Sequence, residues 1–160
     1  MHLLICFDGL TEPNNPGGTG CYGFSIRGLG GPLDVIPGCG VIGDMGTPMT
    51  NNIAEYIALG KALAYLTANA KERITPETEL HIVGDSKLVI EQVNGSWKCE
   101  APHLQRLRDL VRERLKQLGC KYKLEWIPRE QNVEVDQLSR AAYIGRTGLA
   151  IPERAKEAKT

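Results

Sequence analysis

Four acidic residues stand where predicted strands and helices begin or end: Asp8, Glu55, Asp85 and Asp136. Carboxylates gathered at one place repel one another strongly unless a cation lies between them. Because no nitrogen or sulfur ligand is spaced to join them, they predict a site for a hard, oxygen-ligated cation such as Mg²⁺. Two such ions are suited to in-line displacement at phosphorus, so the set points to phosphoryl-transfer chemistry.

Asp8 is the strongest of the four, because it falls within or at the end of an apolar, β-prone segment, where aspartate is disfavoured. The structural alternative is a hairpin turn at Asp8-Gly9. The segment TEPNNPGG that follows cannot be the return strand of such a hairpin, because it consists of turn-forming residues. Asp8 is therefore expected to serve a site rather than a turn.

The other three acids each have an ordinary structural alternative. Glu55 can form a capping box with Asn52 at the start of a helix. Asp85 can be an N-cap aspartate, although ligands bind at the carboxyl ends of strands in helix-covered sheets. Asp136 can pair with Arg140 one helical turn later, which contributes only about 0.2–0.5 kcal/mol.

The periodicity of apolar residues predicts the elements that must position these acids. Strands are expected at residues 1–10, 21–27, 33–43, 79–84 and 121–127, and helices at 52–67, 86–93, 102–118 and 132–143. The order βββαβααβα favours an α/β fold in which three antiparallel strands are followed by parallel ones. We therefore expect a five-stranded mixed sheet flanked by helices.

Composition excludes several classes of protein. The chain has 160 residues, with 19 basic and 19 acidic ones, which argues against a histone-like protein or an acidic disordered tail. Five cysteines without a C-x-x-C pair, and three histidines without metal-ligand spacing, argue against a structural zinc site and fit a reducing cytosol. Neither a membrane-spanning apolar run nor a signal peptide is evident. We expect a cytoplasmic monomer whose catalytic domain spans residues 1–144, with a polar, flexible tail over 145–160.

Over residues 3–142 the sequence resembles type 1 ribonuclease H. The patterns T-N-N-x-x-E, D-S and N-x-x-x-D, in this order and spacing, are together highly specific. The residues that carry the resemblance are Phe7-Asp8-Gly9, Asn15-Pro16-Gly17, Tyr22-Gly23, Thr50 to Glu55, Asp85-Ser86-Lys87 and Asn132 to Asp136. The chain is similar to compact archaeal members, because it lacks the basic protruding helix of some bacterial members and the loop histidine that bacterial members have before the last helix.

The resemblance implies that Asp8, Glu55, Asp85 and Asp136 are catalytic carboxylates that bind two Mg²⁺ ions, with Mn²⁺ as the alternative. It implies endonucleolytic hydrolysis of the RNA strand of an RNA/DNA hybrid, which leaves 5′-phosphate and 3′-hydroxyl ends. The positions that match hybrid contacts are Asn15, Thr50, Asn51, Asn52 and Asn132. Amides suit this task because they can both donate to and accept from a ribose 2′-hydroxyl.

Further substrate contacts are expected outside the matched motifs. Arg129 or Glu130 occupies the place of the absent loop histidine, and Trp97 is expected either to lie against the substrate or to be core. Residues 98–123 hold eight basic and three acidic residues. In that region Arg108, Arg112 and Lys116 form a helical stripe, expected either to contact the phosphates of the DNA strand or to be a solvated face.

Three other functions fit parts of the pattern. A hybrid-binding module without activity would be favoured by loss of a carboxylate, but all four are present. The ribonuclease H domain of a reverse transcriptase would carry the same motifs. A proofreading-type exonuclease would begin with D-x-E in the first strand, and Leu10 at the third position argues against it.

Overall fold

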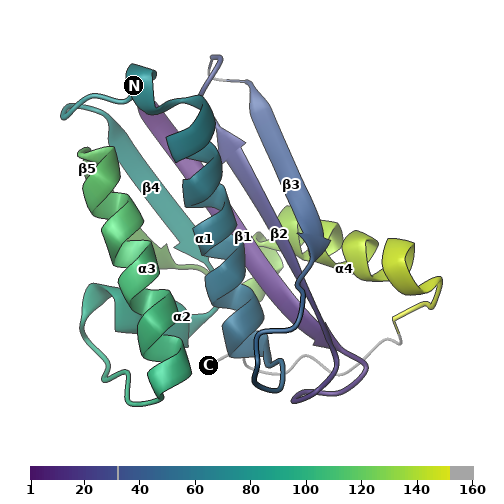
Figure 1. Cartoon of the computed structure of the whole chain (residues 1–160). Coiled ribbons are helices and arrows are strands. Elements are labelled where there is room, and N and C mark those ends of the chain that lie inside the picture. The colour runs from purple at the N-terminus through teal and green to yellow at the C-terminus, as the bar shows by residue number, and fades with distance from the viewer. Residues whose placement is uncertain (32, 152–160) are drawn as a thin grey trace.

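The computed structural model describes residues 1–31 and 33–151. In this part of the chain five strands form one mixed sheet in the order β3-β2-β1-β4-β5 (Figure 1). Its strands are β1 (His2–Glu12), β2 (Thr19–Arg27), β3 (Val35–Val41), β4 (Glu79–Gly84) and β5 (Lys121–Trp126). The first three pair antiparallel, whereas β4 pairs parallel with β1 and β5 parallel with β4. The predicted fold class is confirmed.

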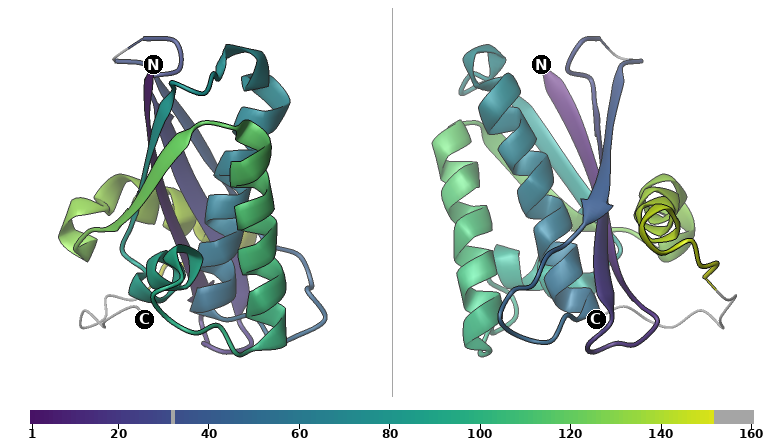
Figure 2. Two further views of the ribbon diagram at one scale, coloured as in Figure 1. Left: turned by 90° about the vertical axis from the view of Figure 1, so that its left-hand side faces the viewer. Right: turned by 45° about the vertical axis from the view of Figure 1, so that its right-hand side comes forward.

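Helices cover the two faces of the sheet unequally (Figure 2). One face carries α1 (Asn51–Asn69), α2 (Lys87–Asn94) and α3 (Pro102–Leu118), and the opposite face carries α4 (Val133–Thr147). Two short 3₁₀ turns are η1 (Lys71–Arg73) and η2 (Arg129–Gln131). Among the described residues no helix is long and apolar enough to cross a membrane.

The C-terminal helix is longer than its periodicity predicts. It continues to Thr147 and ends at Gly148, whose left-handed φ of 70° favours glycine. Residues 145–147, expected to begin the tail, therefore belong to α4. Residues 152–160 of the expected tail, like residue 32, lie outside the described residues.

Alternation along β1 builds the main core. Leu3, Ile5 and Phe7 are fully buried on the side of α1, where they join Leu59 and Leu63 of that helix. Each such side chain contributes about 1.5–3 kcal/mol of burial free energy. This core fixes α1 to β1 and so fixes whatever α1 carries near β1.

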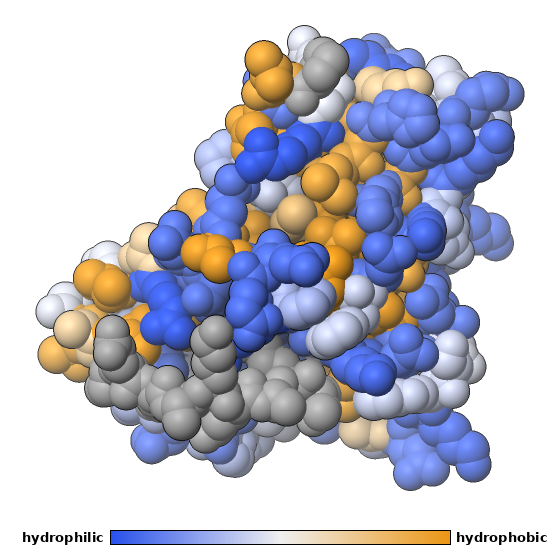
Figure 3. Space-filling view, turned by 180° about the vertical axis from the view of Figure 1, so that it is seen from behind, coloured by the Kyte–Doolittle hydropathy of each residue, from blue (hydrophilic) through white to orange (hydrophobic). Residues whose placement is uncertain are grey.

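The opposite face of the sheet is packed more thinly. Under α4 a small cluster joins Leu10, Cys21 and Tyr143. Beyond α4 the sheet surface carries polar contacts, among them His2 Nδ1 with Glu79 Oε2 at 3.0 Å, with apolar side chains visible between hydrophilic ones (Figure 3). We call the side of α1, α2 and α3 the front face and the side of α4 the back face.

Neither structural alternative considered for Glu55 and Asp85 is observed. The N-cap of α1 is Thr50, whose Oγ1 accepts from Ile53 N at 3.1 Å, so Asn52 and Glu55 form no capping box. The N-cap of α2 is Ser86, whose Oγ accepts from Val89 N at 3.3 Å, and not Asp85. In each case a nearby hydroxyl residue is the N-cap, which leaves the carboxylate for another purpose.

Candidate active site

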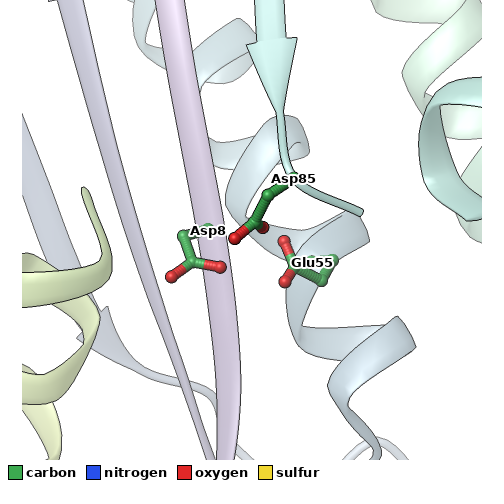
Figure 4. Close-up of side chains that lie close together, drawn as sticks. All are labelled: Asp8, Glu55 and Asp85. Atoms are coloured by element: carbon green, nitrogen blue, oxygen red, sulfur yellow. The ribbon is translucent and has the colours of Figure 1, made fainter. Parts of the chain in front are cut away.

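Three of the four predicted acids meet at one end of the parallel strand pair. Asp8, Glu55 and Asp85 each offer one carboxylate oxygen, and these oxygens lie within 4.8 Å of one another (Figure 4). All three residues are buried, with exposed fractions of 0%, 1% and 4%. The strand register explains two of them, because Phe7 pairs with Gly84 and the next residue on each strand is the acid.

Gly9 explains how Glu55 joins them. A Cβ at Gly9 would lie 2.5 Å from the main-chain nitrogen of Glu55 and would collide with the main chain of Ala54. Only glycine lets the second turn of α1 pack this closely on β1. The dipeptide Asp8-Gly9 therefore combines an acid with the space that brings a second acid to it.

Trp126 supports Asp85 and was missed by reasoning from the sequence. It pairs with Gly84 in the parallel register, and its indole Nε1 donates to the Asp85 carbonyl oxygen at 3.2 Å. The Nζ of Lys87 lies 5.8 Å from the centroid of the same ring, within range of a cation–π contact. A tryptophan at the end of the last strand, next to the strand that ends in Asp85, was the signal that could have identified it.

Asp136 stands apart from the three clustered acids. It lies in the first turn of α4, and its Oδ2 accepts from Arg140 Nε at 3.0 Å, which is the pairing expected as its structural alternative. Asn132 brings this helix to the site, because its Nδ2 donates to the Phe7 carbonyl oxygen at 2.9 Å. The start of α4 is thus fixed next to Asp8, while the Asp136 carboxylate remains outside the cluster.

The donor set fits a hard divalent cation. Three buried carboxylates so close together repel one another, and the repulsion is larger at low dielectric than in water. Oxygen ligands without histidine or thiolate favour Mg²⁺, Ca²⁺ or Mn²⁺ over zinc. Asp8, Glu55 and Asp85 are therefore the residues of the described chain that could hold such an ion.

The predicted hybrid-contacting amides lie in the loop between β1 and β2 and in the first turn of α1, and these two segments are bonded together. Asn15 Oδ1 accepts from Asn51 N at 3.2 Å, and Asn51 Oδ1 accepts from Thr11 N at 2.9 Å. Thr50 is the N-cap of α1, and Asn52 is half-buried in its first turn. The oxygens of Asn15 and Asn51 thus serve the fold, which leaves their amide N–H groups to face a ligand.

The remaining predicted contacts differ in accessibility. Trp97 is 40% exposed, so it is not a core residue. Arg129 is half-buried in η2, immediately before the site end of α4. Asn132 is only 2% exposed, and its observed role is the bond to the Phe7 carbonyl described above.

The structure changes the expectation for the basic stripe on α3. Arg112 donates from Nε to the Val93 carbonyl oxygen at 3.2 Å and from Nη2 to the Gln92 carbonyl oxygen at 3.1 Å, so it caps the end of α2. Arg108 is bonded to Asp109 at 3.0 Å. Two of the three members of the stripe are therefore engaged within the protein, and contact of the stripe with the phosphates of the DNA strand stays a prediction.

The neighbouring helix α2 is held by further side-chain bonds. Tyr56 donates its hydroxyl to Gln92 Oε1 at 2.7 Å, and burial raises the pKa of this tyrosine. Asn94 Nδ2 donates to the Leu124 carbonyl oxygen at 3.3 Å. These bonds fix the C-terminal end of α2, the helix that follows Asp85.

Comparison with known families and proteins places the chain. The family model described as reverse transcriptase-like matches residues 34–142, more than half of the chain. The bifunctional protein Rv2228c of Mycobacterium tuberculosis is 37% identical over 93 residues, which are 58% of this chain and 24% of that protein. Ribonuclease HI of Halobacterium salinarum is 34% identical over 136 residues, which are 85% of this chain and 61% of that protein. The chain thus spans about a quarter of the length of the mycobacterial relative.

Solved structures agree over nearly the whole fold. RNase H1 of Halobacterium salinarum superposes with a TM-score of 0.75 at 29% identity, and covers 91% of this chain and 99% of its own. LC11-RNase H1, solved in complex with an RNA/DNA hybrid, superposes with a TM-score of 0.75 at 27% identity, and covers 90% of this chain and 98% of its own. The resemblance to type 1 ribonuclease H drawn from the sequence motifs is confirmed.

Proposed function

This chain belongs to the reverse transcriptase-like family, and from that premise we propose that it is a ribonuclease H that hydrolyses the RNA strand of RNA/DNA hybrids. The observation that carries the proposal is the buried group of Asp8, Glu55 and Asp85 within 4.8 Å. The motifs that build this group are those of the resemblance, and a similar protein, LC11-RNase H1, was solved with a hybrid bound. We propose cleavage within the strand that leaves 5′-phosphate and 3′-hydroxyl ends.

Asp8, Glu55 and Asp85 would hold divalent metal, Mg²⁺ or Mn²⁺. Asp136, one helical turn after Asn132, is proposed as the fourth catalytic carboxylate. Two bound ions would supply a water nucleophile of lowered pKa and neutralise charge on the leaving oxygen. The residues of the chain orient the reacting groups. Burial keeps the carboxylates fixed, and Trp126 and Gly9 hold Asp85 and Glu55 in place.

Discrimination between RNA and DNA is proposed to come from the side-chain amides of Asn15 and Asn51. The Nδ2 groups of Asn15 and Asn51 can donate to a ribose 2′-hydroxyl, which deoxyribose lacks. Because the oxygens of both amides are held by main-chain N–H groups, their orientation is set before the substrate binds. Asn52, Trp97 and Arg129 are proposed to add contacts along the strand. We expect the chain to act as a monomer, because all four carboxylates come from one chain.

The test offers the purified protein four labelled duplexes or strands with Mg²⁺: RNA/DNA hybrid, double-stranded RNA, single-stranded RNA and DNA duplex. The proposal predicts cleavage of the hybrid alone, with products that carry a 5′-phosphate. Binding of the hybrid without cleavage would instead favour the non-catalytic binding module. A matched Asp85→Asn variant controls for contaminating nucleases, because it keeps the size of the side chain but removes its charge.

A further inference from the structure

The surface is hollowed behind the loop that carries Asn15. This hollow has a volume of about 500 Å³ and lies between residues 17–20 at the start of β2, residues 41–49 after β3 and the end of α4. Gly17 N donates to the Met49 carbonyl oxygen at 2.8 Å, and Ile42 N donates to the Gly20 carbonyl oxygen at 2.8 Å. Since Met49 precedes Thr50, the walls of the hollow are bonded to the loops expected to contact the hybrid.

Four of the residues that line the hollow are glycines: Gly17, Gly18, Gly20 and Gly43. A Cβ at Gly17 or at Gly43 would meet no atom within 4 Å, so each glycine faces open space. Gly17 has a φ of 97°, which favours glycine, but Gly43 has no positive φ. Neither backbone conformation nor packing therefore requires glycine at position 43, and its effect is to leave the hollow open.

One cation borders the hollow. Arg146, in the last turn of α4, is exposed and makes no hydrogen bond or ion pair within residues 1–31 and 33–151. Asp44 is the acidic neighbour, and its Oδ1 accepts from Gly46 N at 2.8 Å. A planar guanidinium beside open main chain suits a phosphodiester, because its donors match the phosphate oxygens in pairs.

The place of Arg146 on α4 sets its distance from the chemistry. It lies ten residues after Asp136 on the same helix, which at 1.5 Å per residue is about 15 Å along the axis. Successive nucleotides of one strand advance about 3.4 Å along a duplex. For a duplex that lies along α4, a phosphate beside Arg146 would therefore be about four nucleotides from one beside Asp136.

We propose that Arg146 and the hollow walled by Gly17 and Gly43 bind a backbone phosphate of the hybrid, about four nucleotides from the cleavage site, on the strand beside Asn15. This inference rests on the proposed function. It assigns the end of α4 a role in substrate binding, separate from the carboxylates at the other end of the site.

The experiment measures hybrid affinity against salt with calcium in place of magnesium, so that cleavage is blocked. It compares Arg146→Ala, Arg146→Lys and Asp44→Asn with Lys71→Ala, a matched control in η1 at the far end of α1. Two hybrids are compared. In the long hybrid the duplex continues for about eight base pairs on each side of the ribonucleotides, and in the short hybrid it continues for about two. Melting temperatures of all variants show that each is folded.

On the long hybrid we expect Arg146→Ala to weaken binding about five- to tenfold and to reduce the log–log salt slope by about one. The short hybrid should not distinguish this variant from wild type. Arg146→Lys should retain part of the affinity, and Asp44→Asn should raise it by removing repulsion. Lys71→Ala should match wild type on both hybrids.

Equal affinity of Arg146→Ala and wild type on the long hybrid would overturn the inference, while cleavage by wild type would leave the proposed function standing. An equal loss on both hybrids would also overturn it, because the contact would then lie at the cleavage site. If wild type neither binds nor cleaves hybrid, the proposed function itself fails.

Discussion

The two faces of the sheet hold their helices by different means. On the front face α1 packs on β1 through a continuous apolar core that includes Ile5, Phe7 and Leu63. On the back face α4 rests on a small cluster around Leu10 and Tyr143 and is secured by polar contacts, such as Arg27 with Glu134 at 2.6 Å. The front face is therefore stabilised mainly by burial, and the back face by a few specific bonds.

This difference coincides with the division among the four acids. Asp8, Glu55 and Asp85 belong to elements fixed by the front-face core, and they form the buried cluster. Asp136 belongs to α4 and is paired with Arg140 outside the cluster. We infer that the front face preorganises the three clustered carboxylates, whereas the fourth depends on how α4 is seated.

The largest effect is expected from removing a clustered charge. Asp85→Asn should lower the hybrid cleavage rate about a hundredfold or more, because a preorganised charge is lost from a buried site. Asp136→Asn should cost less, about tenfold, because its carboxylate lies outside the cluster and is already paired. Rates on labelled hybrid with saturating Mg²⁺ make the comparison. Equal losses would show that Asp136 is as closely engaged as the others.

A second test replaces one tightly packed glycine by alanine on the front face of the sheet and one on the back face. Gly9→Ala would push the main chain of α1 away from β1, and Gly23→Ala would place a Cβ 2.5 Å from the Val135 carbonyl oxygen of α4. Overpacking of this kind costs about 1–3 kcal/mol, and we expect the larger value for Gly9→Ala because the core around it cannot yield. Urea unfolding measures both. A greater loss in Gly23→Ala would contradict the ranking of the faces.

Metal should stabilise the fold through the clustered acids. Binding to the folded state alone adds about 2.7 kcal/mol when the ion is at a hundred times its Kd, so Mg²⁺ should raise the melting temperature. In chelator, Asp8→Asn should melt above wild type, because one of three mutually repelling carboxylates is gone. The same variant should show a smaller Mg²⁺ shift. A wild-type melting curve indifferent to saturating Mg²⁺ would count against the cluster as a metal site.

The smallest effect is expected at the surface ion pair of the back face. Arg27 and Glu134 are both substantially exposed, so Arg27→Ala should lower the free energy of unfolding by less than about 1 kcal/mol. Added salt should reduce even that difference. Unfolding in urea at low and high salt is the measurement. A loss of several kcal/mol would show that this pair, rather than the small apolar cluster, seats α4.

Local signals predicted much of this molecule. The ranges 79–84 and 102–118 match β4 and α3 as observed, because alternation, Pro102 and Gly119 mark their ends within the segments themselves. The N-caps of α1 and α2 are Thr50 and Ser86 and not the alternatives Asn52 and Asp85, because several nearby polar residues can serve the same backbone N–H groups. The bonds of Arg112 and Trp126 join segments distant in sequence, and no local pattern encodes them.

In the candidate site, too, local patterns predicted the elements but not the contacts between distant segments. Spacing placed Asp8, Glu55 and Asp85 at element ends, and the strand order then brings them together. The separation of Asp136 from that group depends on the seating of α4 and on the competing Arg140, neither of which spacing reveals. Motifs thus identified which acids to consider, and packing decided which of them meet.

The central position of β1 also bears on the order in which the molecule can assemble during synthesis. β1 and β2 are joined by a short connection and can pair as soon as both have emerged, whereas pairing with β4 must wait for the intervening helix. Asp8 and Glu55 therefore lack the third carboxylate until residue 85 has been added. A nascent chain that ends before Asp85 lacks one of the three clustered carboxylates, so it has no complete metal site. Metal binding at this site therefore cannot guide the early stages of folding. The ion would therefore bind late in folding, after β4 has paired with β1, and would stabilise a sheet that has already formed.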